Sequence, residues 1–304
     1  MTSVEQVTIT RAEGTSFTVR LHPSPAPQPP EPSIADSTAC PAEVTTAGAP
    51  VVLIVPAMGV RAGYYGKLTE AIREAGLTAA VTELRGHEES GGRTPSRRYD
   101  YGYADLLDDV NAAVIAVRQR LPGAPVYLLG HSLGGHLGMV HAGQNPGHLA
   151  GLLLVASGSV WWRLWHPGMY LVGVVVSAMS RIFGYFPGHR VKFGGREARQ
   201  QMLDWTRFNR TGRLEFGTPR VNHDPAIAEV DLPVLGMSFA GDGFAPAKAV
   251  DGLLAKMPKA QVTRLHVGEG TEPPGHLRWA RRPEVVLPDL VAWIKEQAAR
   301  RAER

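Results

Sequence analysis

The feature of this sequence that most constrains its fold is a regular alternation between short apolar runs and longer segments with helical spacing. Residues 51–55 are all apolar, as expected for a parallel strand that is buried on both faces. Further strands are expected at 78–84, 126–129, 152–156, 234–239 and 261–266, and helices at 65–75, 105–120, 137–144, 247–257 and 288–299. Strands that alternate with helices in this way predict an α/β fold with a doubly wound, mostly parallel sheet.

Two segments precede this alternation. Residues 4–21 alternate apolar and polar side chains around the turn Glu13-Gly14-Thr15, which predicts that 1–22 form an N-terminal β-hairpin of the sheet. Residues 23–50 are rich in proline and hold no aromatic residue. Such a segment buries too little apolar surface to offset its chain entropy, so we interpret it as an extended, flexible loop.

One long insertion interrupts the alternation. Residues 157–230 hold four of the six tryptophans, and ten Lys and Arg residues against five Asp and Glu. An apolar and basic insertion of this length predicts a helical cap or lid over a site, and leaves 51–156 and 231–304 as the α/β core. A helical elaboration that only packs on the core is the alternative. Five arginines of this insertion would meet an anionic leaving group or form a solvated helix face: Arg196, Arg199, Arg207, Arg210 and Arg213.

The sharpest chemical signal is a strand, the pattern Gly130-x-Ser132-x-Gly134, and then a helix. A serine in this context lies on a tight, strained turn that raises its Oγ above the edge of the sheet. Glycine is required at 130 and 134, because a Cβ there would clash with neighbouring backbone. The helix N-terminus behind Ser132 favours negative charge that develops in front of it. Ser132 is therefore the candidate nucleophile, with an accidental glycine-rich turn as the alternative.

A serine nucleophile needs a base and an acid that orients the base. On this type of sheet both follow the serine, at the carboxyl ends of later strands. The strand 234–239 ends just before Asp242, which places this acid at the required edge. Asp231 precedes the same strand and Asp251 lies in the next helix, so both are poorer candidates.

The candidate base is His276. The strand 261–266 leads into a long loop that ends at this residue, so its side chain is free to reach back toward Ser132. His266 still lies in the strand, and we interpret it as a packed or surface residue. His131, next to the serine, is interpreted as a residue that lines the turn.

An oxyanion hole takes one backbone N–H from the residue after the nucleophile, here Leu133, and a second from the loop after an early strand. The strand 51–55 is followed by Pro56-Ala57-Met58-Gly59. Its small residues allow close backbone approach, and the Met58 N–H is the candidate for the second donor. In isolation this segment would read equally well as an ordinary turn.

These motifs resemble the α/β-hydrolase superfamily over residues 51–295. The resemblance rests on five segments: Pro56-Ala57-Met58-Gly59, Leu84-Arg85-Gly86-His87, Gly130-His131-Ser132-Leu133-Gly134-Gly135, Asp242 and Gly275-His276. It is strongest to an esterase-like serine hydrolase branch of bacteria whose oxyanion turn reads Pro-Ala-Met-Gly. The resemblance implies the α/β-hydrolase fold with Ser132 as nucleophile, Asp242 as orienting acid and His276 as general base. Met58 and Leu133 would supply the oxyanion amides, and the insertion would be the cap.

Composition limits the classes of partner. With 44% hydrophobic and 20% charged residues and a net charge of +4, the chain is ordinary globular material and no nucleic-acid polycation. Cys40 is the only cysteine, and neither a metal-ligand pattern nor a cofactor motif is evident, so no metal and no cofactor is expected. No secretory signal and no run long enough to cross a bilayer is visible. We expect a cytoplasmic enzyme without stable membrane insertion, and a homo-oligomer is compatible with the sequence.

The predicted activity is hydrolysis of a carboxylic ester or thioester through an acyl-enzyme intermediate. The cap suggests an apolar acyl substrate, whose pocket would include His131 and the three tryptophans Trp161, Trp162 and Trp165. The same residues would equally serve as plain core. Two alternatives stay open: transfer of the acyl group to an alcohol or amine, as in an acyltransferase or cyclase, and a non-catalytic ligand-binding protein on the same fold.

Overall fold

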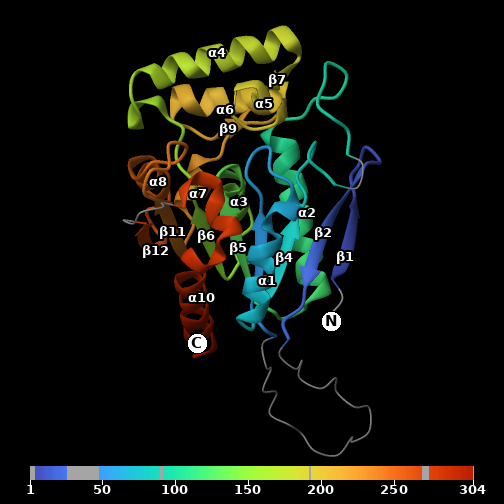
Figure 1. Cartoon of the computed structure of the whole chain (residues 1–304), viewed down its shortest axis with the longest axis vertical. Coiled ribbons are helices and arrows are strands. Elements are labelled where there is room, and N and C mark those ends of the chain that lie inside the picture. Colours follow the sequence, from blue (N-terminus) through green and yellow to red (C-terminus); the bar gives the residue numbers. More distant parts are fainter. Residues whose placement is uncertain (1–3, 26–47, 90–91, 192, 269–273, 304) are drawn as a thin grey trace, which may run out of the picture.

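The computed structural model describes residues 4–25, 48–89, 92–191, 193–268 and 274–303. Its centre is an eight-stranded sheet with the order β1-β2-β4-β3-β5-β6-β11-β12 (Figure 1). The strands are β1 (Glu5–Thr10), β2 (Ser16–His22), β3 (Val51–Val55), β4 (Thr78–Thr82), β5 (Val126–His131), β6 (Gly151–Val155), β11 (Pro233–Phe239) and β12 (Gln261–Val267). Strand β2 pairs antiparallel with β1 and β4, and all other pairs are parallel. The predicted fold class is confirmed.

Helices cover both faces of this sheet. The core helices are α1 (Gly66–Glu74), α2 (Tyr103–Arg120), α3 (Leu133–Gln144), α8 (Ala247–Leu254), α9 (Gly275–Arg278) and α10 (Leu287–Ala302), with 3₁₀ turns η1 (Ala62–Tyr65), η3 (Trp279–Arg281) and η4 (Pro283–Val285). Helices α1 and α10 contact each other on one face, and α2 and α3 contact each other on the other (Figure 1). This is the doubly wound arrangement that the alternating sequence predicts.

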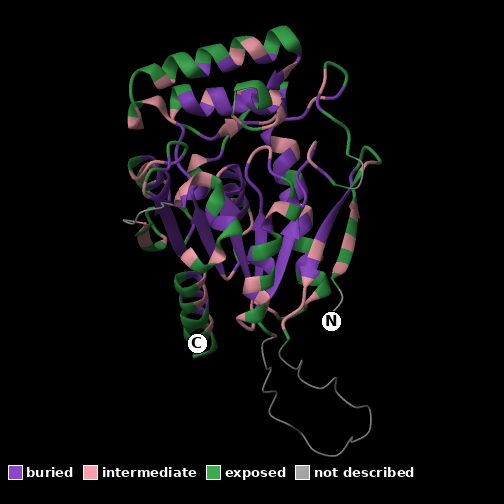
Figure 2. Ribbon diagram, in the orientation of Figure 1, coloured by how far each residue is buried: buried purple, intermediate pink, exposed green. Residues whose placement is uncertain are grey.

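The apolar runs of the sequence form the centre of the sheet. Every residue of β3, β5 and β6 is buried (Figure 2). Parallel strands with helices on both faces have no solvent-facing side, so these runs show no polar alternation. Hairpin strand β1, at the sheet edge, alternates instead between half-buried and exposed residues.

Several element boundaries differ from the sequence expectation. The helix expected at 65–75 begins as the 3₁₀ turn η1 and continues as α1. Helix α2 begins at Tyr103, two residues before the expected start, because the Asp105 carboxylate accepts a hydrogen bond from the Gly102 N–H at 2.8 Å and caps the helix. Helix α3 starts at Leu133, directly after Ser132. The interpretation of 23–50 as a flexible loop falls mostly on residues 26–47, which lie outside the described residues, as does Cys40.

The insertion after β6 lies above the carboxyl edge of the central strands (Figure 1). Its elements are η2 (Trp162–Leu164), α4 (Gly168–Phe183), β7 (Tyr185–Pro187), α5 (Gly188–Val191), β8 (Arg196–Ala198), α6 (Arg199–Thr211), β9 (Glu215–Phe216), β10 (Val221–Asn222) and α7 (Asp224–Ala228). The pairs β7–β8 and β9–β10 are two small antiparallel sheets. Strands of two or three residues are too short to give a periodic signal, and none of them joins the main sheet.

Most of the arginines in this insertion have partners. Arg196 donates to the Pro95 carbonyl at 2.7 Å, and Arg199 pairs with Asp100 at 2.9 Å. Arg207 and Arg213 share Glu215. These contacts tie parts of the insertion to one another and to the core. Within the described part of the chain, no helix is long and apolar enough to span a membrane.

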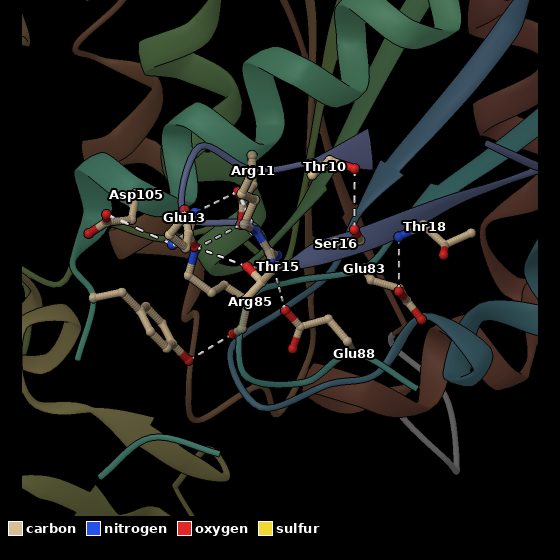
Figure 3. A network of polar contacts seen from close by, with 12 residues as sticks. Thr10, Arg11, Glu13, Thr15, Ser16, Thr18, Glu83, Arg85, Glu88 and Asp105 are labelled. Carbon is tan, nitrogen blue, oxygen red and sulfur yellow. Dashed lines mark hydrogen bonds and ion pairs between the residues drawn. The ribbon is translucent and has the colours of Figure 1, made fainter. Parts of the chain in front are cut away.

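A buried ionic network fastens the N-terminal hairpin to the core (Figure 3). Asp109 of α2 accepts two hydrogen bonds from Arg11, both at 2.9 Å, and two from Arg85, at 3.1 and 2.9 Å. Arg11 also pairs with Glu88 at 2.8 Å, and Arg85 with Glu13 at 2.6 Å. Bidentate pairs of this kind are the strong form of a charge-assisted hydrogen bond. One carboxylate therefore holds two guanidinium groups from the hairpin and from the loop after β4.

We expect Asp109→Ala to lower the free energy of unfolding by about 3–5 kcal/mol, because it leaves two buried guanidinium groups without their shared partner. Urea denaturation followed by circular dichroism measures this change. The matched control is Glu296→Ala, which removes only an exposed pair with Arg300 and should leave the midpoint nearly unchanged. A loss no larger for Asp109→Ala than for the control would contradict the role assigned to the network.

Candidate active site

Ser132 lies on the turn between β5 and α3 with φ 54° and ψ −112°. Positive φ is rare for a residue with a side chain and persists only where the surroundings enforce it. Two backbone hydrogen bonds hold this turn: the Ser132 N–H donates to the Val155 carbonyl at 3.2 Å, and the Gly135 N–H donates to the Ser132 carbonyl at 3.0 Å. The backbone of Ser132 is thus strained and tied to the end of β6.

The flanking glycines allow this turn to pack closely. A Cβ on Gly130 would lie 2.5 Å from the Gly135 Cα, and one on Gly134 would lie 2.1 Å from the Val55 carbonyl oxygen. Both distances are far below van der Waals contact, and in both cases the obstacle is backbone. The requirement for glycine at these two positions is confirmed.

His276 and Asp242 form a hydrogen-bonded pair. The His276 Nδ1 lies 2.9 Å from Asp242 Oδ2 and 3.1 Å from Oδ1. The Asp242 side chain is fully buried, and its Oδ1 also accepts from the N–H groups of Phe244 and Ala245 at 2.8 and 3.0 Å. Because a carboxylate accepts, Nδ1 carries the proton in neutral His276, which leaves Nε2 as the available base.

The alternative acid and base candidates have other partners. His266 on β12 bonds to Ser238 Oγ at 2.7 Å, and Asp251 on α8 pairs with Arg264 at 2.6 Å. None of His266, Asp251 and Asp231 lines the cavity that Ser132 and His276 share. Of the candidate acids and bases, Asp242 and His276 are the two that bond to each other, and His276 shares the cavity with Ser132.

A cavity of about 920 Å³ lies between the carboxyl edge of the sheet and the insertion. The core contributes Met58, Ser132, Leu133 and His276 to its wall. The insertion contributes mostly apolar residues, which include Trp165, Met169, Leu171, Val172, Val175, Val176, Met179, Phe186, Phe193 and Trp205. Ser132 and His276 therefore face one mainly apolar space, of a size typical for ligand sites.

Of the four residues expected in the substrate pocket, Trp165 lines this cavity. Trp161, Trp162 and His131 are not among its wall residues. The Trp162 ring packs edge-on against Tyr170, with ring centroids 5.7 Å apart. A Cβ on Gly212 would lie 2.9 Å from the Trp161 ring, so this ring packs against the end of α6.

Two hydrogen bonds hold the expected oxyanion turn, residues 56–59, in its conformation. The Ala57 N–H donates to Tyr65 Oη at 3.0 Å, and the Val60 N–H donates to the Ala57 carbonyl at 3.1 Å. Neither bond uses the Met58 N–H. Leu133 is the first residue of α3, a position whose N–H has no partner within its own helix. Gly59 has φ 74°, and a Cβ there would lie 2.4 Å from the Gly195 nitrogen, so the insertion packs directly on this turn.

His131 connects the expected oxyanion turn to the short helix α9, which carries His276. It is fully buried, and burial holds its pKa well below the usual value, so the ring is neutral. Its Nε2 donates to the His276 carbonyl at 2.8 Å, and its Nδ1 therefore accepts from Tyr65 Oη, 2.7 Å away. Nothing in the sequence pointed to Tyr65, since no periodicity or motif marks a contact between residues so far apart.

A second contact, which the sequence did not predict, joins the insertion to the core. Glu197 of β8 is fully buried, and its Oε2 lies 3.2 Å from the His87 Nε2 in the loop after β4. Its Oε1 accepts from the Gly195 N–H at 2.7 Å. Burial by itself lowers the pKa of His87, but the hydrogen bond and charge of Glu197 outweigh it and the net shift is upward. This pair fixes the part of the insertion that touches the oxyanion turn.

Comparisons with known proteins identify related sequences and related folds. Residues 47–205 match the family model described as "Serine aminopeptidase, S33". The human protein named monoglyceride lipase is 32% identical over 283 residues, which cover 83% of this chain and 85% of that protein. Among solved structures, a putative lipase from Acinetobacter baumannii has a TM-score of 0.61 at 15% identity and covers 98% of this chain and 93% of its own. Est1E from Butyrivibrio proteoclasticus, solved with ferulic acid bound, has a TM-score of 0.62 at 14% identity and covers 96% of this chain and 99% of its own. At these identities the two solved structures show the shared fold.

We expect His131→Phe to lower kcat by about tenfold or more, because helix α9, which carries His276, loses its hydrogen bond from His131, and a displacement of an ångström at a reacting group costs up to about 10²-fold. Steady-state kinetics on a chromogenic ester measures kcat and KM. The matched control is His141→Phe, which replaces a buried histidine of α3 that bonds to Asn111 outside the cavity. An equal loss of kcat in both variants would contradict the assigned role of His131.

Proposed function

The chain belongs to the serine aminopeptidase S33 family of the α/β-hydrolase superfamily and is a serine hydrolase that cleaves esters, and from this premise we propose that Ser132, His276 and Asp242 are its catalytic triad. The observation that carries the proposal is the Asp242–His276 pair at 2.9 Å, whose histidine lines the same cavity as the strained Ser132. Order along the chain supports it as well, since Ser, Asp and His follow each other as they do on this type of sheet.

In the proposed reaction, His276 Nε2 takes the proton of Ser132 Oγ as this oxygen attacks the ester carbonyl carbon. The resulting oxyanion accepts hydrogen bonds from the N–H groups of Met58 and Leu133. As the intermediate collapses, the C–O bond of the ester breaks and His276 gives its proton to the leaving alcohol. Water, activated by the same histidine, then cleaves the acyl-enzyme, which releases the acid and restores Ser132. Asp242 keeps the imidazole in the tautomer that this cycle requires.

The substrate we propose is an ester of an apolar acyl group with a small polar alcohol. The insertion at 157–230 serves as the cap, and its helix α4 supplies much of the apolar wall of the cavity. A wall of this kind favours an acyl chain because each buried methylene contributes about 0.8 kcal/mol. The name of the human relative, monoglyceride lipase, supports a monoacyl ester of glycerol as the first substrate to test.

A fluorophosphonate probe tests the triad. We expect rapid labelling of the wild type, none in Ser132→Ala, and labelling slowed by roughly 10³–10⁴-fold in His276→Ala and Asp242→Asn. Gel fluorescence against time measures these rates, with folding checked by circular dichroism.

The matched controls are His266→Gln and Asp251→Asn, which change the alternative base and acid and should label at the wild-type rate. Loss of labelling in either control, or a folded wild type that stays unlabelled, would refute the assignment. The second result would favour a ligand-binding protein on the same fold. Product analysis with added alcohols separates hydrolysis from acyl transfer.

The preferred length of the substrate's acyl chain should reveal how much of it the cavity accommodates. We expect kcat/KM on monoacylglycerols to rise by roughly fourfold per methylene until the cavity is filled, as each further methylene leaves water. Val176→Phe should move the optimum to shorter chains, because Val176 lines the cavity and is 4% exposed. The control is Val174→Phe, on the same helix but exposed and away from the cavity wall. The same optimal chain length in both variants would mean that the acyl chain does not bind next to Val176.

A further inference from the structure

Two buried side chains in the wall of this apolar cavity each have a polar atom without a hydrogen-bond partner. Tyr103 and His136 both line the cavity and are 1% and 3% exposed. Within the described part of the chain, Tyr103 Oη and His136 Nδ1 make no hydrogen bond. Leaving such an atom unpaired costs free energy, so an unpaired polar atom at a ligand cavity calls for an explanation.

His136 presents an acceptor. Its Nε2 lies 2.9 Å from the Gly158 carbonyl oxygen, which only accepts, so Nε2 carries a proton. Burial lowers the pKa of His136 to about 4, so the ring is neutral and Nδ1 has a free lone pair. His136 lies four residues after Ser132, in the first turn of α3, and both residues line the cavity.

Tyr103 presents a donor beside it. Its ring lies nearly parallel to that of His136, with an interplanar angle of 27° and centroids 6.5 Å apart. Its N–H donates to Asp204 Oδ2 at 2.9 Å, which fixes the first residue of α2. Burial, and then the charges of Asp204 and Glu197, hold the pKa of Tyr103 well above its usual value, so its hydroxyl keeps its proton.

We propose that Tyr103 and His136, together the polar pair, form a subsite that binds a hydroxyl group carried on the acyl chain of the substrate. A hydroxyl accepts from Tyr103 Oη–H and donates to His136 Nδ1, and so satisfies both atoms at once. The proposal rests on the proposed function, because the acyl chain must enter this cavity from the ester held at Ser132.

The chemistry of the pair selects a hydroxyl over other groups. A ketone would accept from Tyr103 but offer nothing to His136. A carboxylate would meet the negative charges of Asp204 and Glu197 that already act on Tyr103. An unsubstituted chain would bury both polar atoms unpaired, and a site built to bond a substrate hydroxyl rejects the analogue that lacks it. Ser132 and His136 are separate residues of the cavity wall, so the hydroxyl lies some carbons away from the ester carbonyl.

Binding to the Ser132→Ala variant tests this inference without turnover. Isothermal titration compares a plain monoacyl ester with isomers in which one hydroxyl moves carbon by carbon along the chain. We measure the affinity ratio of each hydroxylated ester to the plain one. For one position, the ratio should be roughly 3- to 10-fold higher than for neighbouring positions, which is about the net worth of one to two hydrogen bonds.

Two variants on the same background identify the residues. Tyr103→Phe keeps the ring and removes only the donor, so the ratio at the preferred position should fall by about 3- to 10-fold. Tyr127→Phe is the matched control, because Tyr127 Oη is also buried without a partner but lies outside the cavity wall. His136→Leu is a second test that removes the acceptor and should also lower the ratio. Comparing ratios across variants cancels the difference in hydrophobicity between the esters.

Equal ratios at all positions, or a preference that survives both Tyr103→Phe and His136→Leu, would overturn the inference and leave ordered water as the partner of the pair. Failure of the proposed function looks different, since it appears as a wild type that neither reacts with the fluorophosphonate nor hydrolyses any ester. A labelled, active wild type without hydroxyl preference therefore refutes the subsite alone.

Discussion

The close packing of the turn around Ser132 is the constraint on which the rest of the site depends. This residue keeps a backbone conformation that is unfavourable for any side chain, and it does so because α3 begins against the ends of β3 and β5 with no room for a Cβ at Gly130 or Gly134. The same contact brings the N-terminus of α3 next to the turn after β3. Met58 and Leu133, the two expected oxyanion donors, both line the cavity that Ser132 faces.

His276, the proposed base, is held by hydrogen bonds from two sides. Asp242 holds the His276 ring, while His131 holds the His276 carbonyl and is itself held by Tyr65. Tyr65 also bonds the Ala57 N–H in the oxyanion turn. The expected oxyanion turn and the proposed base are therefore linked through the buried side chains of Tyr65 and His131. Such a link limits independent movement of the two parts, which is what preorganised catalysis requires.

Sequence reasoning proposed the parts of the site that topology constrains, and the structure brings two of them, Asp242 and His276, into hydrogen-bond contact. The carboxyl ends of parallel strands lie at one edge of a sheet, so the residues after β11 and β12 could be assigned as Asp242 and His276 without a structure. It could not find Tyr65, the Glu197–His87 pair or the Arg11–Asp109–Arg85 network. Each of these joins positions far apart in the chain, and no periodicity or local motif records such a contact. The short strands of the insertion were missed for a related reason, since two or three residues carry no alternation.

The surplus of basic residues in the insertion has a structural explanation, and this explanation bears on whether the substrate is charged. This surplus suggested an anionic ligand, yet four of the five arginines singled out for that role bind carboxylates or a carbonyl of this chain. None of these four lines the cavity. The guanidinium groups therefore hold the insertion together and to the core, while its apolar residues face Ser132 across the cavity. A neutral acyl chain suits such an apolar wall, and the proposed hydroxyl subsite of Tyr103 and His136 would add polar discrimination to it.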